Sequence, residues 1–184
     1  MKKVFWGFFF VFINFNLSVN AHTLNLLPDF VGYILLYQAA GAMAEESGRF
    51  RKIRPFTLAM AVYTGILWTG NLLGVTGGGS WLDTILSLAA LVISLYISWS
   101  VVQAILELES ARGADLNGAS VRTAWFVLLA AQIVGVLGAM LLSFLVLLVW
   151  IALLVGIIWF LAALWKCAKR YEGLPPKNAG LGEL

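Results

Sequence analysis

The feature that most constrains the fold is an unbroken run of 43 residues, 123–165, without a charged side chain. As one α-helix this run would be about 65 Å long, roughly twice the thickness of the hydrocarbon core of a bilayer. It must therefore fold back on itself, and Ser143 and Phe144 mark the expected turn. The run predicts two transmembrane helices, over residues 123–142 and 145–165.

The composition of the whole chain supports a membrane-embedded fold. Of the 184 residues, 61% are hydrophobic and only 11% are charged, whereas about 25% of the residues in a soluble domain are charged. Further apolar segments cover residues 4–17, 28–44, 55–75 and 81–106. The sequence therefore predicts an all-α fold with one domain, residues 1–184, built as an integral membrane bundle of six transmembrane helices.

The basic residues predict how this bundle is oriented. The first dense cluster of charge is a polar loop after the second segment, and its basic residues are Arg49, Arg51, Lys52 and Arg54. If this loop is cytosolic, all 12 Lys and Arg residues lie on the cytosolic side of a six-span bundle, and both termini are cytosolic. Because the basic residues sit between apolar spans rather than along a soluble face, no nucleic-acid partner is expected.

The outer connections of this topology complete the argument. They are expected at about residues 18–27, 76–80 and 143–145, and they contain no Lys or Arg. This separation is what the positive-inside rule predicts. A five-span model with one long final helix would place the C-terminal basic cluster outside, so it is rejected.

The first segment has a second interpretation as a signal peptide. Lys2 and Lys3, a short apolar stretch and a small residue at Ala21 fit a cleavable signal. Asn14 and Asn16 interrupt the apolar stretch and favour a retained first helix. Cleavage would leave five spans with the same orientation.

No catalytic, cofactor or metal motif stands out. The single cysteine, Cys167, excludes an internal disulfide and a zinc site built from cysteines of one chain. His22, Asp29 and Asp83 are metal-binding residue types at the predicted outer rim, but their spacing matches no metal motif, and aspartates at helix starts already have a capping role. Charged residues are absent from the predicted mid-membrane region, which argues against a proton relay or a voltage sensor. The chain is not expected to be an enzyme or to need a cofactor.

Three polar residues within the predicted spans are candidates for a site. Asn71, Ser94 and Gln132 lie on the third, fourth and fifth segments, and polar groups within a membrane are costly. One interpretation is a polar cavity for a small solute that opens outward near Asn71. The other is hydrogen bonding between helices, for which Ser87, Ser94 and Ser98 share one helical face.

The run from Leu26 to Tyr33, of the form LLPDFxGY, resembles the N-terminus of small multi-pass membrane proteins from Firmicutes. The resemblance covers roughly the first 45 residues. It implies a bacterial plasma membrane and a retained first segment, and it implies no activity. In size, span count and small-residue rows such as Ala40 and Ala44, the chain is also similar to the substrate-binding subunits of energy-coupling-factor vitamin transporters. That similarity is at the level of fold.

Two functions follow from these features. The first is a non-catalytic interaction or accessory subunit that contacts the lipid bilayer and another membrane protein, or a second copy of itself. The second is a small-solute binding or transport protein that uses the polar face. The lack of catalytic groups and the charged cytosolic segments favour the first.

Overall fold

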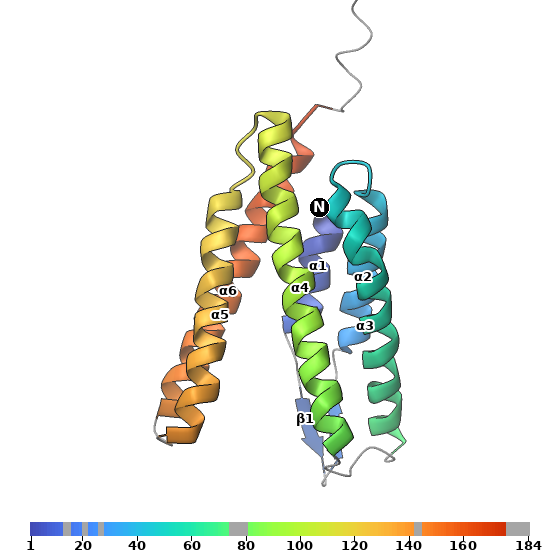
Figure 1. Cartoon of the computed structure of the whole chain (residues 1–184), viewed down its shortest axis with the longest axis vertical. Helices are drawn as coiled ribbons and strands as arrows, with labels where there is room; N and C mark the ends of the chain where they lie inside the picture. The colour runs from blue at the N-terminus through green and yellow to red at the C-terminus, as the bar shows by residue number, and fades with distance from the viewer. Residues whose placement is uncertain (13–15, 20–21, 26–27, 74–80, 142–144, 176–184) are drawn as a thin grey trace, which may run out of the picture.

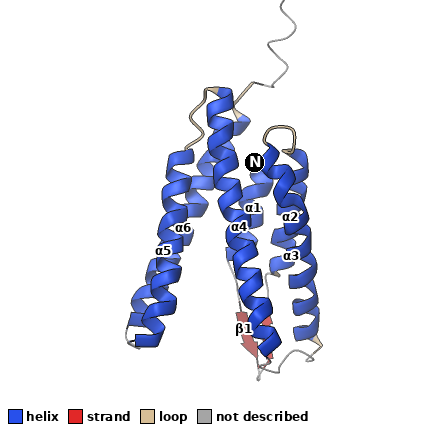
Figure 2. Ribbon diagram, viewed as in Figure 1, coloured by secondary structure: helices blue, strands red, loops and turns tan. Residues whose placement is uncertain are grey.

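The computed structural model describes residues 1–12, 16–19, 22–25, 28–73, 81–141 and 145–175 (Figure 1). These residues form helices and one short β-hairpin (Figure 2). The elements in chain order are α1 (Lys2–Phe12), β1 (Asn16–Val19), β2 (His22–Asn25), α2 (Asp29–Ala42), α3 (Gly48–Leu72), α4 (Trp81–Arg112), α5 (Gly118–Leu141) and α6 (Leu145–Glu172). The predicted helical fold is confirmed, and the hairpin is an addition to it.

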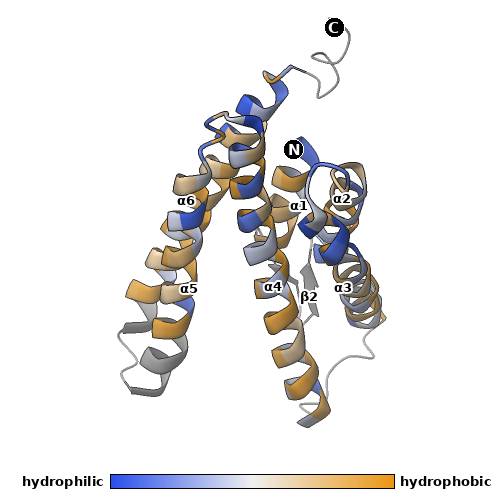
Figure 3. Cartoon of the chain, turned by 45° about the horizontal axis from the view of Figure 1, so that its top comes forward, coloured by the Kyte–Doolittle hydropathy of each residue, from blue (hydrophilic) through white to orange (hydrophobic). Residues whose placement is uncertain are grey.

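The helices pack in the order in which they occur in the chain. Each contacts the next one along the sequence, and α1 also packs against α6, which closes the ring. An ion pair of 2.8 Å between Lys2 Nζ on α1 and Glu172 Oε2 on α6 places the start of the first helix beside the end of the last. We call this end of the bundle the charged end, because hydrophilic residues gather there near the N-terminus (Figure 3).

The predicted basic loop is helical, so that part of the prediction is wrong. α3 begins at Gly48 and carries Pro55 inside it, so the four basic residues lie in its first two turns. The Oγ of Ser47 caps the helix by accepting a hydrogen bond from the backbone N–H of Arg49 (3.2 Å). Proline costs one backbone hydrogen bond in a helix interior, and here it does not end the helix.

α4 also extends beyond its predicted boundary. Residues 107–112, which follow the predicted apolar segment 81–106, form its last turns. The helix ends at Arg112. Gly113, the next residue, has a φ of +58°, and the backbone N–H of Ala114 donates to the carbonyl oxygen of Glu109 (3.3 Å). This arrangement is a Schellman cap, in which a left-handed glycine ends the helix.

The first predicted segment is shorter than expected. α1 ends at Phe12, and residues 16–19 pair with residues 22–25 as the antiparallel strands β1 and β2. At 11 and 14 residues, α1 and α2 are only about 16 Å and 21 Å long, less than the ~30 Å of a hydrocarbon core. Of the predicted outer connections, residues 76–80 and 143–144 lie outside the described residues.

Within the described residues, two helices are long and apolar enough to cross a membrane. They are α4 and the stretch Leu148–Glu172 of α6. Gly118–Val134 in α5 is a shorter apolar helical stretch within the residues described. By length and composition, these helices fit the predicted membrane location.

α1 and α2 touch through two glycines. A Cβ atom on Gly32 would lie 2.6 Å from the carbonyl oxygen of Gly7, and one on Gly7 would lie 3.0 Å from that of Gly32. The two backbones are therefore in direct contact, as small residues permit between helices in lipid. Leu36 is buried beside the same contact.

The buried core lies toward the charged end. Fully buried side chains on α4 run from Ile97 to Leu108, whereas residues 81–92 are exposed apart from the half-buried Ala90. Figures 1 and 3 show α5 and α6 diverging from α4 toward the opposite end, which we call the far end. The bundle is therefore closed at the charged end and splayed at the far end.

The Gly7–Gly32 contact predicts that Gly32→Ala destabilises the bundle. The added methyl group would press on backbone rather than on a flexible side chain, which costs about 1–3 kcal/mol. The melting temperature (Tm) in detergent should fall relative to the unsubstituted protein. Gly48→Ala is the matched control, because no atom lies within 4 Å of its added Cβ. Equal Tm values for the two variants would contradict the close contact.

Candidate functional site

The last turns of α4 carry three charged side chains that reach three different elements. The first is Glu107, whose carboxylate accepts a hydrogen bond from Ser47 Oγ (2.7 Å) and pairs with Arg49 Nε. Ser47 also caps α3, so one carboxylate fixes both the start of α3 and the end of α4. This contact reinforces the packing of α3 on α4 at the charged end.

The second charged side chain, Glu109, holds the start of α5. Its Oε1 accepts hydrogen bonds from the backbone N–H groups of Leu116 and Gly118, both at 2.7 Å. The first N–H groups of a helix have no partner within that helix, so a carboxylate there satisfies them and opposes the positive end of the helix dipole. Glu109 therefore supplies the N-terminal cap of α5 from the preceding helix.

The third, Arg112, reaches the connection between α2 and α3. Its guanidinium pairs with Glu46 Oε1 (2.7 Å) and donates to the carbonyl oxygen of Pro175 (3.2 Å). The Arg112 and Glu46 side chains are 17% and 18% exposed, which makes this the least exposed of the described ion pairs. It joins α4 to the α2–α3 connection and to the segment after α6.

Two further ion pairs complete the polar network at the charged end. Arg170 on α6 pairs with Asp115 Oδ2 (2.6 Å), and Lys2 on α1 pairs with Glu172 on α6. The backbone N–H of Asn117 and the Arg170 guanidinium hold the pKa of Asp115 below its usual value. Asn117 has a φ of +69°, and its N–H donates to Asp115 Oδ1 (2.8 Å), which shapes the short turn before α5.

The structure divides the predicted basic cluster into two pairs. Arg49 is engaged by Glu107, and Arg54 donates to the hydroxyl oxygen of Tyr37 (3.0 Å) while its guanidinium lies 4.7 Å from the centre of that ring. Arg51 and Lys52 are exposed, and within the described residues they form no ion pair. Of these four basic residues, Arg51 and Lys52 are therefore the ones available to a partner.

The three predicted intramembrane polar residues do not gather at one place. Asn71 is exposed in the last turn of α3, where it already has an interaction of its own. Ser94, in the middle of α4, is half-buried and interacts with the hydroxyl of Tyr33. Gln132 is half-buried on α5, and in the described part of the chain α3 and α5 do not pack together.

A polar contact that sequence reasoning did not assign to a partner joins α4 to α5. Ser98 Oγ accepts a hydrogen bond from Trp125 Nε1 (3.0 Å) and donates to the carbonyl oxygen of Leu95 (3.0 Å). Trp125 also packs on Trp99, with ring centres 4.7 Å apart. The shared helical face of Ser94 and Ser98 was the signal for this contact, and it fits the helix-to-helix interpretation of these serines.

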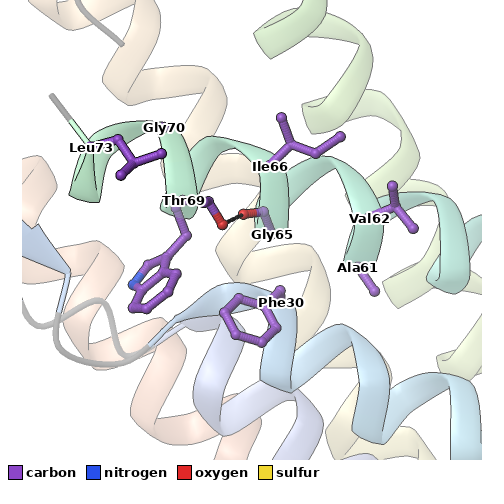
Figure 4. A pocket seen from close by; sticks show the side chains of 9 residues that line it. Phe30, Ala61, Val62, Gly65, Ile66, Thr69, Gly70 and Leu73 are labelled. Carbon is purple, nitrogen blue, oxygen red and sulfur yellow. Dashed lines mark hydrogen bonds between the residues drawn. The ribbon is translucent and has the colours of Figure 1, made fainter. Parts of the chain in front are cut away.

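The cavity between α2 and α3 is apolar. It has a volume of about 600 Å³ and is lined by residues that include Phe30, Gly65, Ile66 and Trp68 (Figure 4). Its hydroxyl group, from Thr69, donates to the carbonyl oxygen of Gly65 (2.8 Å), as Figure 4 shows. This lining can hold hydrocarbon, and it offers little to a polar solute.

The described residues contain no cluster of three or more His, Cys, Asp or Glu residues that could hold a metal ion. Asp29 and Asp83 lie in the first turns of α2 and α4 and have interactions of their own. Comparison with protein-family models, curated proteins and solved structures finds no match. The resemblance of the LLPDFxGY run therefore stays a prediction.

The polar network predicts different effects for two neighbouring arginines. Arg49→Gln removes the ion-pair partner of Glu107 and should lower stability by about 0.2–1 kcal/mol, the usual range for an exposed ion pair. Arg51→Gln should leave the Tm unchanged. Thermal unfolding in detergent measures both. The difference should shrink at high salt, because salt screens exposed charges; a difference that persists unchanged would point to a non-ionic role for Arg49.

Proposed function

We propose that this chain is a multi-pass protein of a bacterial plasma membrane, with both termini and the charged end in the cytosol. Support comes from the two long apolar helices and from the gathering of hydrophilic residues at one end (Figure 3). The six-span topology needs α1 and α2 to enter the membrane as a short packed pair. The glycine contact between them supports a first helix that stays in the bundle.

Within that membrane we propose a non-catalytic interaction subunit that binds a helix of another membrane protein. The observation that carries this proposal is the exposure of the far half of α4. Trp81, Ile85 and Leu88 are 70%, 54% and 61% exposed, and the exposed residues lie on all sides of the helix. α5 and α6 diverge from this half of α4 toward the far end (Figure 1).

Small residues make this half of α4 suitable for contact with a helix. The exposed Ser87 and the half-buried Ala90 lie one turn apart, and Ser94 and Ser98 continue the same face into the core. Helices in lipid associate by close packing at such residues and by hydrogen bonds from serine. The partner helix would extend a contact that Ser98 already makes with α5 within the chain.

The solute-binding alternative has less support. Asn71, Ser94 and Gln132 lie on three helices that do not bring them together, and the α2–α3 cavity is apolar. A solute protein would need these residues to converge on one polar site. Asn71→Leu and Gln132→Leu should therefore leave binding of the partner protein intact, whereas reversing the charge of Arg51 and Lys52 should impair it. Loss of this binding in both leucine variants would favour the alternative.

The orientation can be tested with single cysteines. Cys167 is buried and stays in place. Trp81→Cys should react with a membrane-impermeant maleimide added to intact cells, and Arg51→Cys should react only after lysis. The unsubstituted chain is the control for background labelling. Labelling of Arg51→Cys in intact cells would reverse the proposed topology.

The interaction proposal predicts a bound partner that depends on Ser87. We expect native mass spectrometry of the protein, purified from its host in a gentle detergent, to find a second membrane protein in fixed stoichiometry. Ser87→Phe should abolish that complex. Ala59→Phe should preserve it, because Ala59 is an exposed small residue on α3, away from the proposed face.

Other results of this measurement have clear meanings. Two copies of this chain that separate in Ser87→Phe would make the partner a second copy. A lone chain that carries a defined polar molecule would overturn the subunit proposal in favour of solute binding.

A further inference from the structure

A second apolar groove lies between α1 and α6 and opens at the surface of the bundle. Its volume is about 490 Å³, and its walls are Phe5, Trp6 and Phe9 on α1 and Ile158, Leu161 and Trp165 on α6. These residues recur at helical spacing on each helix, so the groove follows both helix axes. Its lining is apolar and suits a hydrocarbon chain.

Aromatic rings packed edge-on or at a tilt give the groove a fixed shape. The ring of Phe5 lies 4.9 Å from that of Trp165 across the two helices, and Trp6 lies 5.3 Å from Phe5 and 5.2 Å from Phe9. Behind them, Phe8 on α1 packs edge-on against the buried Phe160 on α6. Such contacts each add to the stability of the wall, so the groove does not depend on a ligand to form it.

The mouth of the groove is cationic. Lys2 precedes Phe5 and Trp6 by three and four residues, and Lys169 follows Trp165 by four, so each lysine continues a wall of the groove toward the charged end. Lys169 Nζ lies 5.4 Å from the centre of the Trp165 ring. Glu172, which pairs with Lys2, is the acidic group at this mouth, and the exposed Lys166 follows Trp165 directly on α6.

We propose that this groove binds one anionic phospholipid, with an acyl chain between α1 and α6 and the phosphate between Lys2 and Lys169. The apolar walls account for the chain, and the cationic mouth selects a negatively charged headgroup. Basic pockets between membrane helices on the cytosolic side are suited to such headgroups, and Trp165 lies where aromatic residues meet the interface. The inference rests on the proposed membrane location and does not involve the proposed partner helix.

The test uses the purified full-length chain in detergent with added lipid. Phosphatidylglycerol and phosphatidylcholine with identical acyl chains are compared by native mass spectrometry and by the Tm. Phosphatidylglycerol should remain bound and raise the Tm, and phosphatidylcholine should do so more weakly. Glycerol phosphate, which has the charge but no acyl chain, should not compete.

Two substitutions separate the headgroup from the chain. Lys169→Gln should weaken phosphatidylglycerol binding about fivefold, the effect expected for one lysine near an anionic surface, and should leave phosphatidylcholine unchanged. Ala162→Phe places a ring in the groove from an exposed position and should reduce the binding of both lipids. Arg122→Gln is the matched control, because Arg122 is an exposed cation at the charged end on α5, outside the groove.

Three outcomes would overturn the proposal. They are equal retention of the two lipids, binding that is insensitive to both Lys169→Gln and Ala162→Phe, and a dimer of the chain that Ala162→Phe dissociates. Because the lipid is added to purified protein, the result is independent of the orientation in cells and of any partner at Ser87. Failure of either proposal therefore leaves the other open to its own test.

Discussion

The fold depends on charged groups at the end of α4 that satisfy polar groups on its neighbours. Glu107 engages the cap of α3, Glu109 provides the cap of α5, and Arg112 joins the α2–α3 connection. Backbone groups at helix ends have no partners within their own helix, and a buried group left without a hydrogen bond costs free energy. α4 thus satisfies polar groups on both α3 and α5. The packed core lies next to these charged groups, from Leu108 back to Ile97 of α4.

Much of the helical architecture was predictable, because apolar length and glycine turns are local properties. The positions of α4, α5 and α6 follow from runs of apolar residues. The boundaries at 48 and 112 were not predictable in the same way. Charged residues considered alone predict a loop. The partners that make them helical, such as Ser47 and Glu107, are 60 residues apart in the sequence.

The candidate site shows the same division between local and distant information. The shared face of Ser94 and Ser98 is a property of helix periodicity, and it led to the serine that bonds Trp125. Asn71 and Gln132 are both polar residues within predicted spans, but whether they meet depends on how α3 and α5 are arranged. The groove between α1 and α6 is formed by segments from opposite ends of the chain, so no local sequence pattern predicts it.

The splayed shape also has a mechanical consequence. α5 is 24 residues long and is anchored at its first turn by Glu109, so it acts as a lever of about 36 Å. A change of only 5° in its tilt at that anchor would displace its other end by about 3 Å. Rearrangements of a few side chains at the charged end would therefore arrive at the far end as movements large enough to open or close a helix contact.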